Sequence, residues 1–202
     1  MRPYLTLLAT LLISTTAIAA DSPIALTDIS KMPAGAYTLD DKHASTSFAI
    51  THLGFSHYRG RFDHIEASID LNPSDIKQSS VKATIYPASV DTHNSTLEAE
   101  LASDKFFNAD KYPTITFASD KIEVTGKNHG KIHGTLTMMG VSKPVVLDTV
   151  LNGAGTDNFA HAQKIGFSAD LHIKRSDYGM SAYIPAVGDD VDLHIEAEFV
   201  KS

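Results

Sequence analysis

The sequence IGFSADLHIK, residues 165–174, has an apolar side chain at every odd position and Gly, Ser, Asp, His or Lys at every even position. The sequence VDLHIEAEF, residues 191–199, shows the same alternation. Successive side chains of a β-strand point to opposite faces, so both segments predict strands with one apolar and one solvated face. Such one-sided strands are typical of antiparallel sheets, which can leave one face in water.

Weaker alternation continues upstream. Further candidate strands are Tyr37–Leu39, Thr46–His52, Ile65–Leu71, Val81–Ile85, Thr114–Ser119, Lys121–Thr125, Lys131–Met138 and Val145–Leu151. The apolar parity changes between Phe62 and Ile65, which predicts a bulge near Asp63-His64, and Pro87 stops the strand before it. About nine or ten short strands separated by turns such as Gly126–Asn128 predict an all-β antiparallel barrel or sandwich.

One segment departs from the strand pattern. Ser95–Ala102 (STLEAELA) is rich in helix formers, with Leu97 and Leu101 four residues apart, and predicts a short helix between two strands. Phe106 and Phe107 follow it. These two rings either plug the mouth of a barrel or anchor the helix to the sheet.

The first residues read as a leader. Arg2 precedes an apolar run from Tyr4 to Ile13, and Ala17–Ala19 offers the small residues that a signal peptidase reads. The run is too short to span a bilayer core of about 30 Å, which argues against a membrane anchor. The expected organisation is a cleaved signal peptide at 1–19, an irregular lead-in at 20–35 and one barrel domain at 36–202, located in the periplasm.

Composition excludes several classes. With 43% hydrophobic and 20% charged residues, the chain is globular rather than disordered. It has no cysteine, which excludes disulfides, thiolate zinc sites and cysteine nucleophiles. Its net charge of −7, one unit more negative once Arg2 is removed, disfavours nucleic acid as a partner.

Motifs for catalysis or metal binding are missing from the sequence. None of the ten histidines has a compact ligand spacing such as HExxH, and His172 and His194 lie on the polar side of their predicted strands. The sequence contains no GxSxG, Walker or GxGxxG motif. We therefore expect no enzyme, no catalytic residues and no bound metal.

The number of one-sided strands favours closure into a barrel, because closure removes exposed strand edges. A barrel of about eight strands can be filled by its own side chains or can hold one small ligand. Small residues on the apolar face, Ala83, Gly134 and Ala169, would leave room for an elongated apolar guest. A barrel filled by its larger residues remains the alternative.

A set of short motifs runs in order from Tyr37 to Val200. They are Tyr37–Asp40, His43-Ala44, Phe48, Thr51–Ser56, Gly60–Phe62, Ser89–Thr92, Leu101–Asn108, Lys111–Phe117, Gly134–Val145 and Arg175–Met180. Each motif is modest alone, but the ordered set is specific. In these motifs the chain resembles the YceI-like family of exported, lipocalin-like, polyisoprenoid-binding proteins.

The resemblance implies an extended antiparallel lipocalin-like β-barrel of about eight strands, with one or two short helices, around a long apolar tunnel. Members of this family hold an isoprenoid chain, as in a quinone or a polyprenyl phosphate, by its tail. Such a tail offers no hydrogen bonds, so affinity must come from apolar burial at ~25 cal/mol per Å². Polar groups are needed only at the mouth, where they orient the headgroup.

The chain departs from its relatives at one place. Where they commonly carry an Arg and, three residues later, a His, this sequence has Leu97 and Glu100. A carboxylate there would repel an anionic pyrophosphate, which favours a neutral headgroup such as a quinone. Arg59, Arg61 and Arg175 remain as candidate cationic partners.

The expected function is that of a periplasmic carrier, storage or scavenging protein for an isoprenoid-type lipid or quinone, without a chemical step or another cofactor. The expected ligand-binding residues are Phe48, Ile50, His52, Phe62, Ile85, Leu97, Leu101, Phe106, Phe117, Met138, Phe167, Arg175 and Tyr178. His52, Arg175 and Tyr178 are the polar members, expected near the ligand or an entrance.

Two other functions stay open. One is a quinone- or haem-linked redox partner or enzyme, for which His52 is the best titratable group. The other is a stress-related structural protein with a filled core. Expected partners are an apolar or lipid ligand and, transiently, a membrane or a membrane redox protein, with homodimerisation left open.

Overall fold

The computed structural model describes residues 28–202. The signal peptide predicted at 1–19 and the first part of the predicted lead-in therefore lie outside the described residues. The strands are β1 (Gly35–His52), β2 (Ser56–Phe62), β3 (Ile65–Leu71), β4 (Ser80–Ile85), β5 (Val90–Asp91), β6 (Ile115–Val124), β7 (His129–Met138), β8 (Val141–Asp157), β9 (Ala162–Lys174) and β10 (Val187–Lys201). The helix is α1 (Ser95–Ala102), and short 3₁₀ turns are η1 (Ile29–Lys31), η2 (Ile76–Gln78), η3 (Pro87–Ser89) and η4 (Arg175–Tyr178).

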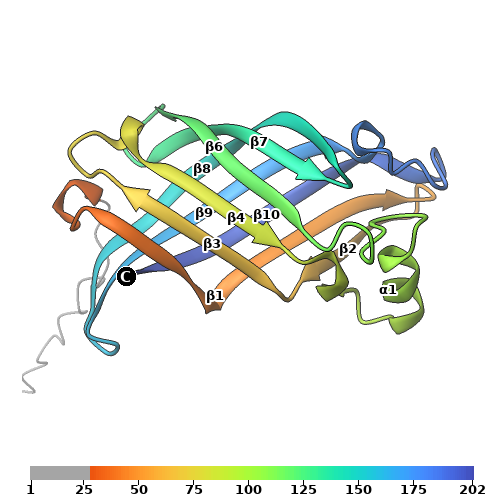
Figure 1. The fold of residues 1–202 in the computed structure, drawn as a ribbon, viewed down its shortest axis with the longest axis horizontal. Coiled ribbons are helices and arrows are strands. Elements are labelled where there is room, and N and C mark those ends of the chain that lie inside the picture. Colours follow the sequence, from red (N-terminus) through yellow and green to blue (C-terminus); the bar gives the residue numbers. More distant parts are fainter. Residues whose placement is uncertain (1–27) are drawn as a thin grey trace, which may run out of the picture.

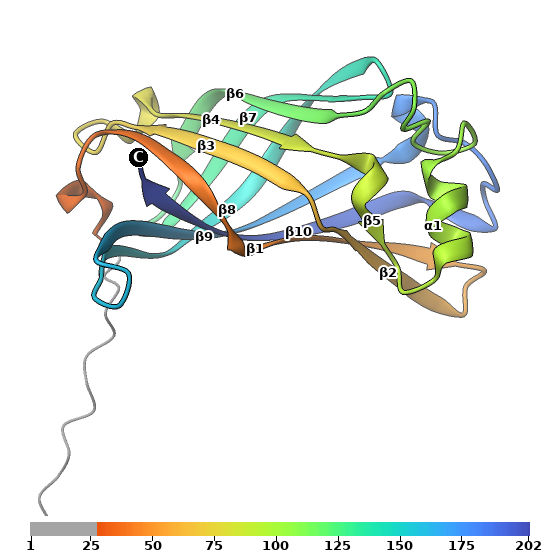
Figure 2. The ribbon, with the colours of Figure 1, turned by 60° about the horizontal axis from the view of Figure 1, so that its bottom comes forward.

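The strands form a closed antiparallel barrel. Its order is β1-β3-β4-β6-β7-β8-β9-β10, and β10 pairs again with β1, which makes eight barrel strands. Figures 1 and 2 show an elongated barrel with α1 and the β1–β2 turn at one end and η1 with the β8–β9 turn at the other. The predicted lipocalin-like barrel of eight strands is confirmed.

β1 is the longest strand of the described chain and covers both segments, 37–39 and 46–52, that the sequence predicts as separate strands. It pairs with β10 along its length, with a register shift between Leu39 and Ala44. On its other side its first part pairs with β3 and its second part with β2. The bulge expected near Asp63-His64 is instead a full break between β2 and β3, where Asp63 N–H donates to the carbonyl of Ser89 and His64 N–H to its Oγ, at 3.0 and 2.9 Å.

The predicted helix and the end of β4 are confirmed, whereas two other predicted strands are joined into one. The two strands expected at 114–119 and 121–125 form one strand, β6, with an irregularity between Ser119 and Lys121. α1 has the predicted bounds, and the Asn94 side chain caps it by accepting from the N–H of Leu97. β4 ends before Pro87, as predicted, because proline cannot donate to the ladder.

The core consists of two clusters of buried side chains. One contains Met32, Tyr37, Ile69, Leu71, Leu151, Ala154, Ile165 and Phe199. The other contains Phe106, Ile115, Leu136, Met138, Leu171, Tyr178 and Met180. Met32, in the predicted irregular lead-in, is thus part of the folded core.

Two inward glycines make room for aromatic rings. A Cβ on Gly60 would lie 2.5 Å from Cζ of Phe48, and a Cβ on Gly134 would lie 2.5 Å from Cζ of Phe117. The space directly beside Gly134 is occupied by the Phe117 ring. The glycines therefore shape the wall by letting phenylalanine rings lie against the backbone.

The barrel wall opens between β8 and β9. Their pairing begins at Asp148 and Asp170, so within the described chain the first part of β8, residues 141–147, has no β9 partner. η4 contacts both strands, and its Tyr178 is only 2% exposed. Tyr178 therefore acts as a packing residue that fills the opening, and burial raises the pKa of its hydroxyl, which has no hydrogen-bond partner among the described residues.

We predict that Tyr178→Phe leaves the free energy of unfolding unchanged or raises it, because an unpaired buried hydroxyl costs about 1–3 kcal/mol. Tyr178→Ala should lower it by about 3–5 kcal/mol, because it opens a cavity in the wall. Urea denaturation of the two variants and the parent protein measures both effects. A loss with Tyr178→Phe as large as with Tyr178→Ala would show that the hydroxyl is needed.

Two histidine–carboxylate groups lie on the outer wall of β9 and β10. His172 Nδ1 and Nε2 lie 2.8 and 3.1 Å from Asp192 and Asp190. His194 Nδ1 and Nε2 lie 2.7 and 3.0 Å from Asp170 and Glu196. Hydrogen bonds to Asp192 and to Asp170 are the largest causes that raise the pKa of His172 and His194, respectively.

A raised histidine pKa stabilises the fold while the ring is charged. This contribution is complete below the ordinary value of 6.5 and is lost as pH rises through the raised pKa. We therefore predict that the urea midpoint of the parent protein falls as pH rises above 6.5. The double variant His172→Gln, His194→Gln should lose part of this fall, because each exposed histidine contributes less than about 1 kcal/mol to it. His161→Gln, which alters a histidine without an ion pair in residues 28–202, is the control. An unchanged pH dependence in the double variant would contradict the prediction.

Candidate functional site

A cavity of about 870 Å³ occupies the inside of the barrel. Its wall is built from the inward side chains of the barrel strands, which are apolar along most of its length. This volume lies within the range of typical small-molecule sites, about 300–1,000 Å³. The structure therefore contains a largely apolar cavity rather than a core filled entirely by its own side chains.

Nearly all the predicted ligand-binding residues line this cavity. They are Phe48, Ile50, His52, Phe62, Ile85, Leu97, Leu101, Phe106, Phe117, Met138, Phe167 and Arg175. Tyr178 is not among them, because it packs between β8 and β9. The structure thus brings together, around one space, residues from both halves of the sequence.

Strand parity could have found further lining residues. Inward positions of β3 and of the last two strands also face the cavity, namely Ile65, Ala67, Ile69, Leu71, Ala169, Leu171, Ile173, Val191, Leu193, Ile195, Ala197 and Phe199. Their alternation was visible in the sequence, but it could not distinguish a position that lines a cavity from one that fills a core.

Among residues 28–202, four polar residues are buried, and all four lie on the cavity wall. Thr46, Ser79 and Thr149 carry short hydroxyls, and Arg175 is 2% exposed. The Ser79 hydroxyl accepts from the N–H of Asn72 at 2.9 Å, and the Thr149 hydroxyl donates to the carbonyl of Leu147 at 3.4 Å. The hydroxyls of Ser79 and Thr149 therefore form hydrogen bonds with the backbone rather than facing a ligand unpaired.

Arg175 organises the loop that follows it. Its guanidinium donates at 2.7–3.0 Å to the carbonyls of Met180, Ala182, Val187 and Gly188. Burial lowers the pKa of Arg175, whereas nearby Asp189 opposes this effect. Because these bonds use four of its N–H groups, Arg175 has little capacity left for an anionic headgroup.

The other two candidate cations point away from the cavity. Arg61 Nε lies 3.0 Å from Asp63 and 3.0 Å from Asp91 on the outer surface. Arg59 is exposed on the same face of β2, and neither side chain lines the cavity. Among the three arginines, none presents a free charge to the cavity.

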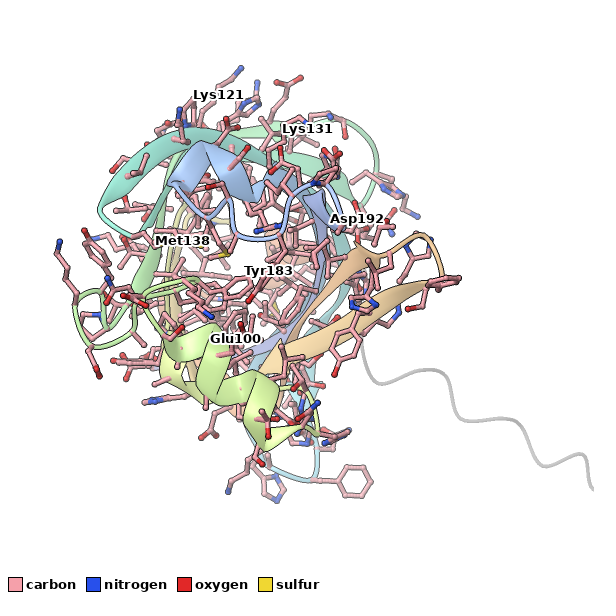
Figure 3. All side chains as sticks on the ribbon, turned by 90° about the vertical axis from the view of Figure 1, so that its right-hand side faces the viewer. Glu100, Lys121, Lys131, Met138, Tyr183 and Asp192 are labelled. Atoms are coloured by element: carbon pink, nitrogen blue, oxygen red, sulfur yellow. The ribbon has the colours of Figure 1, made fainter. Side chains whose placement is uncertain are left out.

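A carboxylate marks the end of the cavity that α1 covers. Glu100 accepts a hydrogen bond from the Tyr183 hydroxyl at 2.8 Å. Lys105 Nζ lies 3.5 Å from both groups, and this contact, first with Tyr183 and then with Glu100, raises the pKa of Lys105. Figure 3 shows Glu100 and Tyr183 lying over this end of the barrel. Leu97, one turn before Glu100 on α1, also lines the cavity.

Aromatic residues surround the same end. Phe107 meets Phe62 edge to face with ring centroids 5.6 Å apart, and Phe106 lies 6.1 Å from the Tyr183 ring. The ring contacts anchor the segment after α1 to the barrel. Both phenylalanines also line the cavity, so they help to close this end of the barrel. His52 is exposed at the rim, 6.5 Å between ring centroids from Tyr58.

The opposite end has a polar rim that the sequence did not predict. Glu123, Lys127, Asn128 and His129 of the β6–β7 hairpin line it. The Asn128 carbonyl accepts from the N–H of Leu151 at 2.8 Å, which fixes the turn to β8. Turn residues carry no periodicity, so no signal placed them at the cavity.

One histidine–carboxylate group has the geometry of a cation site. Asp40, His43 and Glu198 bring ligand atoms within 4.8 Å of one another on the outer wall. Lys164 Nζ lies 3.0 Å from both carboxylates, so its ammonium occupies the position of a cation. Burial raises the pKa of Asp40, but hydrogen bonds from His43 and Lys164 outweigh it and hold that pKa at about 2.

No helix within residues 28–202 is long and apolar enough to cross a membrane.

The chain is similar to several known proteins. The model of the YceI-like domain matches residues 37–199. A UPF0312 protein of Vibrio cholerae is 32% identical over 162 residues, which cover 79% of this chain and 85% of that protein. The crystal structure of the YCEI protein of Campylobacter jejuni has a TM-score of 0.69 and 39% identity, and the match covers 75% of this chain and 90% of that chain.

A polyisoprenoid-binding domain from Saccharophagus degradans has the same fold. Its structure has a TM-score of 0.65 and 19% identity, covering 83% of this chain and 99% of that chain. The match to the family model runs from β1 into β10 and leaves out only the first two residues of β1 and the last two of β10. The chain belongs to the YceI-like family.

Proposed function

We propose that the barrel binds an isoprenoid-type lipid, either a polyisoprenoid or a quinone, and that the protein carries, stores or scavenges this lipid in the periplasm. The observation that carries the proposal is the apolar cavity of about 870 Å³, which runs through the barrel and has polar groups at its two ends. The solved fold neighbour that is a polyisoprenoid-binding domain supports it.

The chemistry of the wall suits a hydrocarbon tail. Burying one CH₂ group contributes about 0.8 kcal/mol, so a few isoprene units supply substantial affinity without a hydrogen bond. The buried Thr46, Ser79 and Thr149 add only short hydroxyls to this wall. A guest with polar groups along its length would leave many of them unpaired, at a cost.

The α1 end favours a neutral headgroup. Glu100 places a carboxylate there, and Arg175, the only buried cation among residues 28–202, is engaged by the loop 180–188. The ammonium of Lys105 forms an ion pair with the Glu100 carboxylate and is therefore not free for a ligand. An anionic pyrophosphate would meet a carboxylate and no unpaired cation, whereas Glu100 would not repel a neutral quinone.

We propose binding without a chemical step. His52 lies at the rim of the cavity, but its ring is exposed and forms no ion pair within the described part of the chain. The alternative of a filled structural core disagrees with the open cavity. Transient contact with a membrane would supply and remove the lipid.

We predict that Ala83→Phe blocks lipid loading. Ala83 faces the cavity, whereas Ala118 lies on the neighbouring strand and is exposed, so Ala118→Phe is a matched control. Each protein is purified from its native compartment, and bound lipid is extracted and identified by mass spectrometry. We expect one isoprenoid per parent or control molecule and strongly reduced loading in Ala83→Phe.

Thermal unfolding shows whether the Ala83→Phe barrel is folded, and the smaller change Ala83→Leu replaces it if it is not. A parent protein that is consistently empty, or equal loading of all variants, would overturn the proposed function.

The headgroup preference gives a separate prediction. Removing the Glu100 charge by Glu100→Gln should strengthen binding of a polyprenyl pyrophosphate roughly fivefold, because a like charge is removed, and leave binding of a long-chain quinone unchanged. Asp104→Asn removes an exposed carboxylate nearby that does not line the cavity and serves as the control. Titration of each ligand into delipidated protein measures this. A parent protein that prefers the pyrophosphate would rule out the neutral headgroup.

A further inference from the structure

The turn between β1 and β2 exposes two large apolar side chains. Phe55 is 89% exposed and Leu53 is 53% exposed. The turn itself is well defined, because the N–H of Leu53 donates to the carbonyl of Ala186 at 2.7 Å and that of Phe55 to the carbonyl of His52 at 2.9 Å. Neither apolar side chain is needed to close it.

The backbone makes a leucine at this position costly. Leu53 has a φ of +52°, in the left-handed region that glycine and asparagine adopt most readily. A turn optimised for water would carry one of those residues here. The fold accepts both strain and apolar exposure at Leu53, which indicates a role outside the monomer.

The turn stands at the entrance of the cavity. Ile50 and His52 before it and Tyr58 after it line the cavity. Tyr183, on the loop bonded to the turn, is 51% exposed and also lines it. Figures 1 and 2 show the β1–β2 turn projecting beside α1 at this end. The exposed apolar side chains thus continue the apolar wall out to the surface.

The strand that follows the turn is basic. His57, Arg59 and Arg61 alternate along the exposed side of β2, and residues 44–62 contain no Asp or Glu, in a chain with a net charge of −7. Arg61 is held by Asp63 and Asp91, but no carboxylate within residues 28–202 lies within 4.0 Å of Arg59.

Negative charge lies on the other side of β1. β10 carries Asp189, Asp190 and Asp192 there. Asp189 accepts from Ser176, Asp190 is bound by Lys174 and His172, and Asp192 by His172. Asp190 and Asp192 are paired locally, whereas Asp189 is hydrogen-bonded to Ser176 and not to a cation. The β1–β2 hairpin itself presents an apolar tip and, in Arg59, a cation with no carboxylate of residues 28–202 within 4.0 Å.

We propose that residues 52–61, the docking hairpin, bind an anionic lipid surface, with Leu53 and Phe55 inserted among the lipids. Apolar side chains beside basic ones are the combination that holds a protein in the headgroup region. In this orientation the mouth opens toward the membrane, so a lipid tail can pass into the cavity without crossing water. This inference rests on the proposed function, which supplies the reason for such contact.

Tryptophan fluorescence tests the proposal, because the chain has no tryptophan. Phe55→Trp places a single probe at the tip, and Phe159→Trp places one at the opposite end, where Phe159 is 88% exposed. Both proteins are purified after export, so they share the same amino terminus. With vesicles of phosphatidylethanolamine and phosphatidylglycerol, emission of Phe55→Trp should move to shorter wavelength and that of Phe159→Trp should not. Phosphatidylcholine vesicles should give a smaller shift.

Vesicle co-sedimentation of variants that lack Phe55 or Arg59 measures how much the apolar tip and the basic side chain each contribute to membrane binding. Phe55→Ser should weaken binding to the anionic vesicles roughly tenfold or more, and Arg59→Gln roughly fivefold, whereas Phe159→Ser should have no effect. Absence of a shift in Phe55→Trp, or equal shifts at both ends, would overturn the proposal. So would a shift that needs no vesicles and grows with protein concentration, which would identify the tip as an interface between two copies of the chain.

Lipid content separates this inference from the proposed function. Phe55→Ser leaves the cavity wall intact, so protein already loaded should retain its lipid while its transfer from vesicles slows. Normal vesicle binding by an empty parent protein would contradict the carrier function but not the docking hairpin. A loaded parent protein that ignores vesicles would contradict the docking hairpin alone.

Discussion

The pairing of β1 with β10 is the interaction on which the rest of the structure depends. β1 is hydrogen-bonded to β10 along one edge and to β3 and β2 along the other, so the first and last strands of the domain close the sheet. Closure turns the apolar faces of eight strands toward one interior and pairs the first barrel strand with the last, so that few strand edges stay open. Without cysteine, the chain has no covalent link for this task.

The interior is large because the strands supply more wall than their side chains can fill. Gly60 and Gly134 let the Phe48 and Phe117 rings lie against the backbone, which leaves the middle of the barrel open. Polar groups gather at the two ends, with Glu100 and Tyr183 at one and Lys127 and the residues after it at the other. This division suits a ligand with a long apolar body and a polar end.

Charge is arranged to keep the interior neutral. Arg175 is buried, yet its guanidinium serves the carbonyls of its own loop. Lys164 is held between Asp40 and Glu198 outside the barrel, and the histidines of β9 and β10 are paired with carboxylates on the outer wall. The excess negative charge therefore belongs to the wetted surface, and the basic hairpin after Phe55 is the local exception.

Alternation at 165–174 and 191–199 determined the strand type and the inward faces, because side-chain direction in a strand follows local geometry alone. The choice between a sandwich and a closed barrel depended on the pairing of β1 with β10. Most of the predicted cavity residues followed from that parity. The tertiary structure decided what parity cannot express. It joined the segments 37–39 and 46–52 into one strand, since pairing with β10 spans both. It moved Tyr178 into the gap between β8 and β9 and committed Arg175 to its loop, since both outcomes depend on contacts between distant segments. It also decided that the barrel is hollow, because the space left inside depends on how rings from neighbouring strands pack against one another.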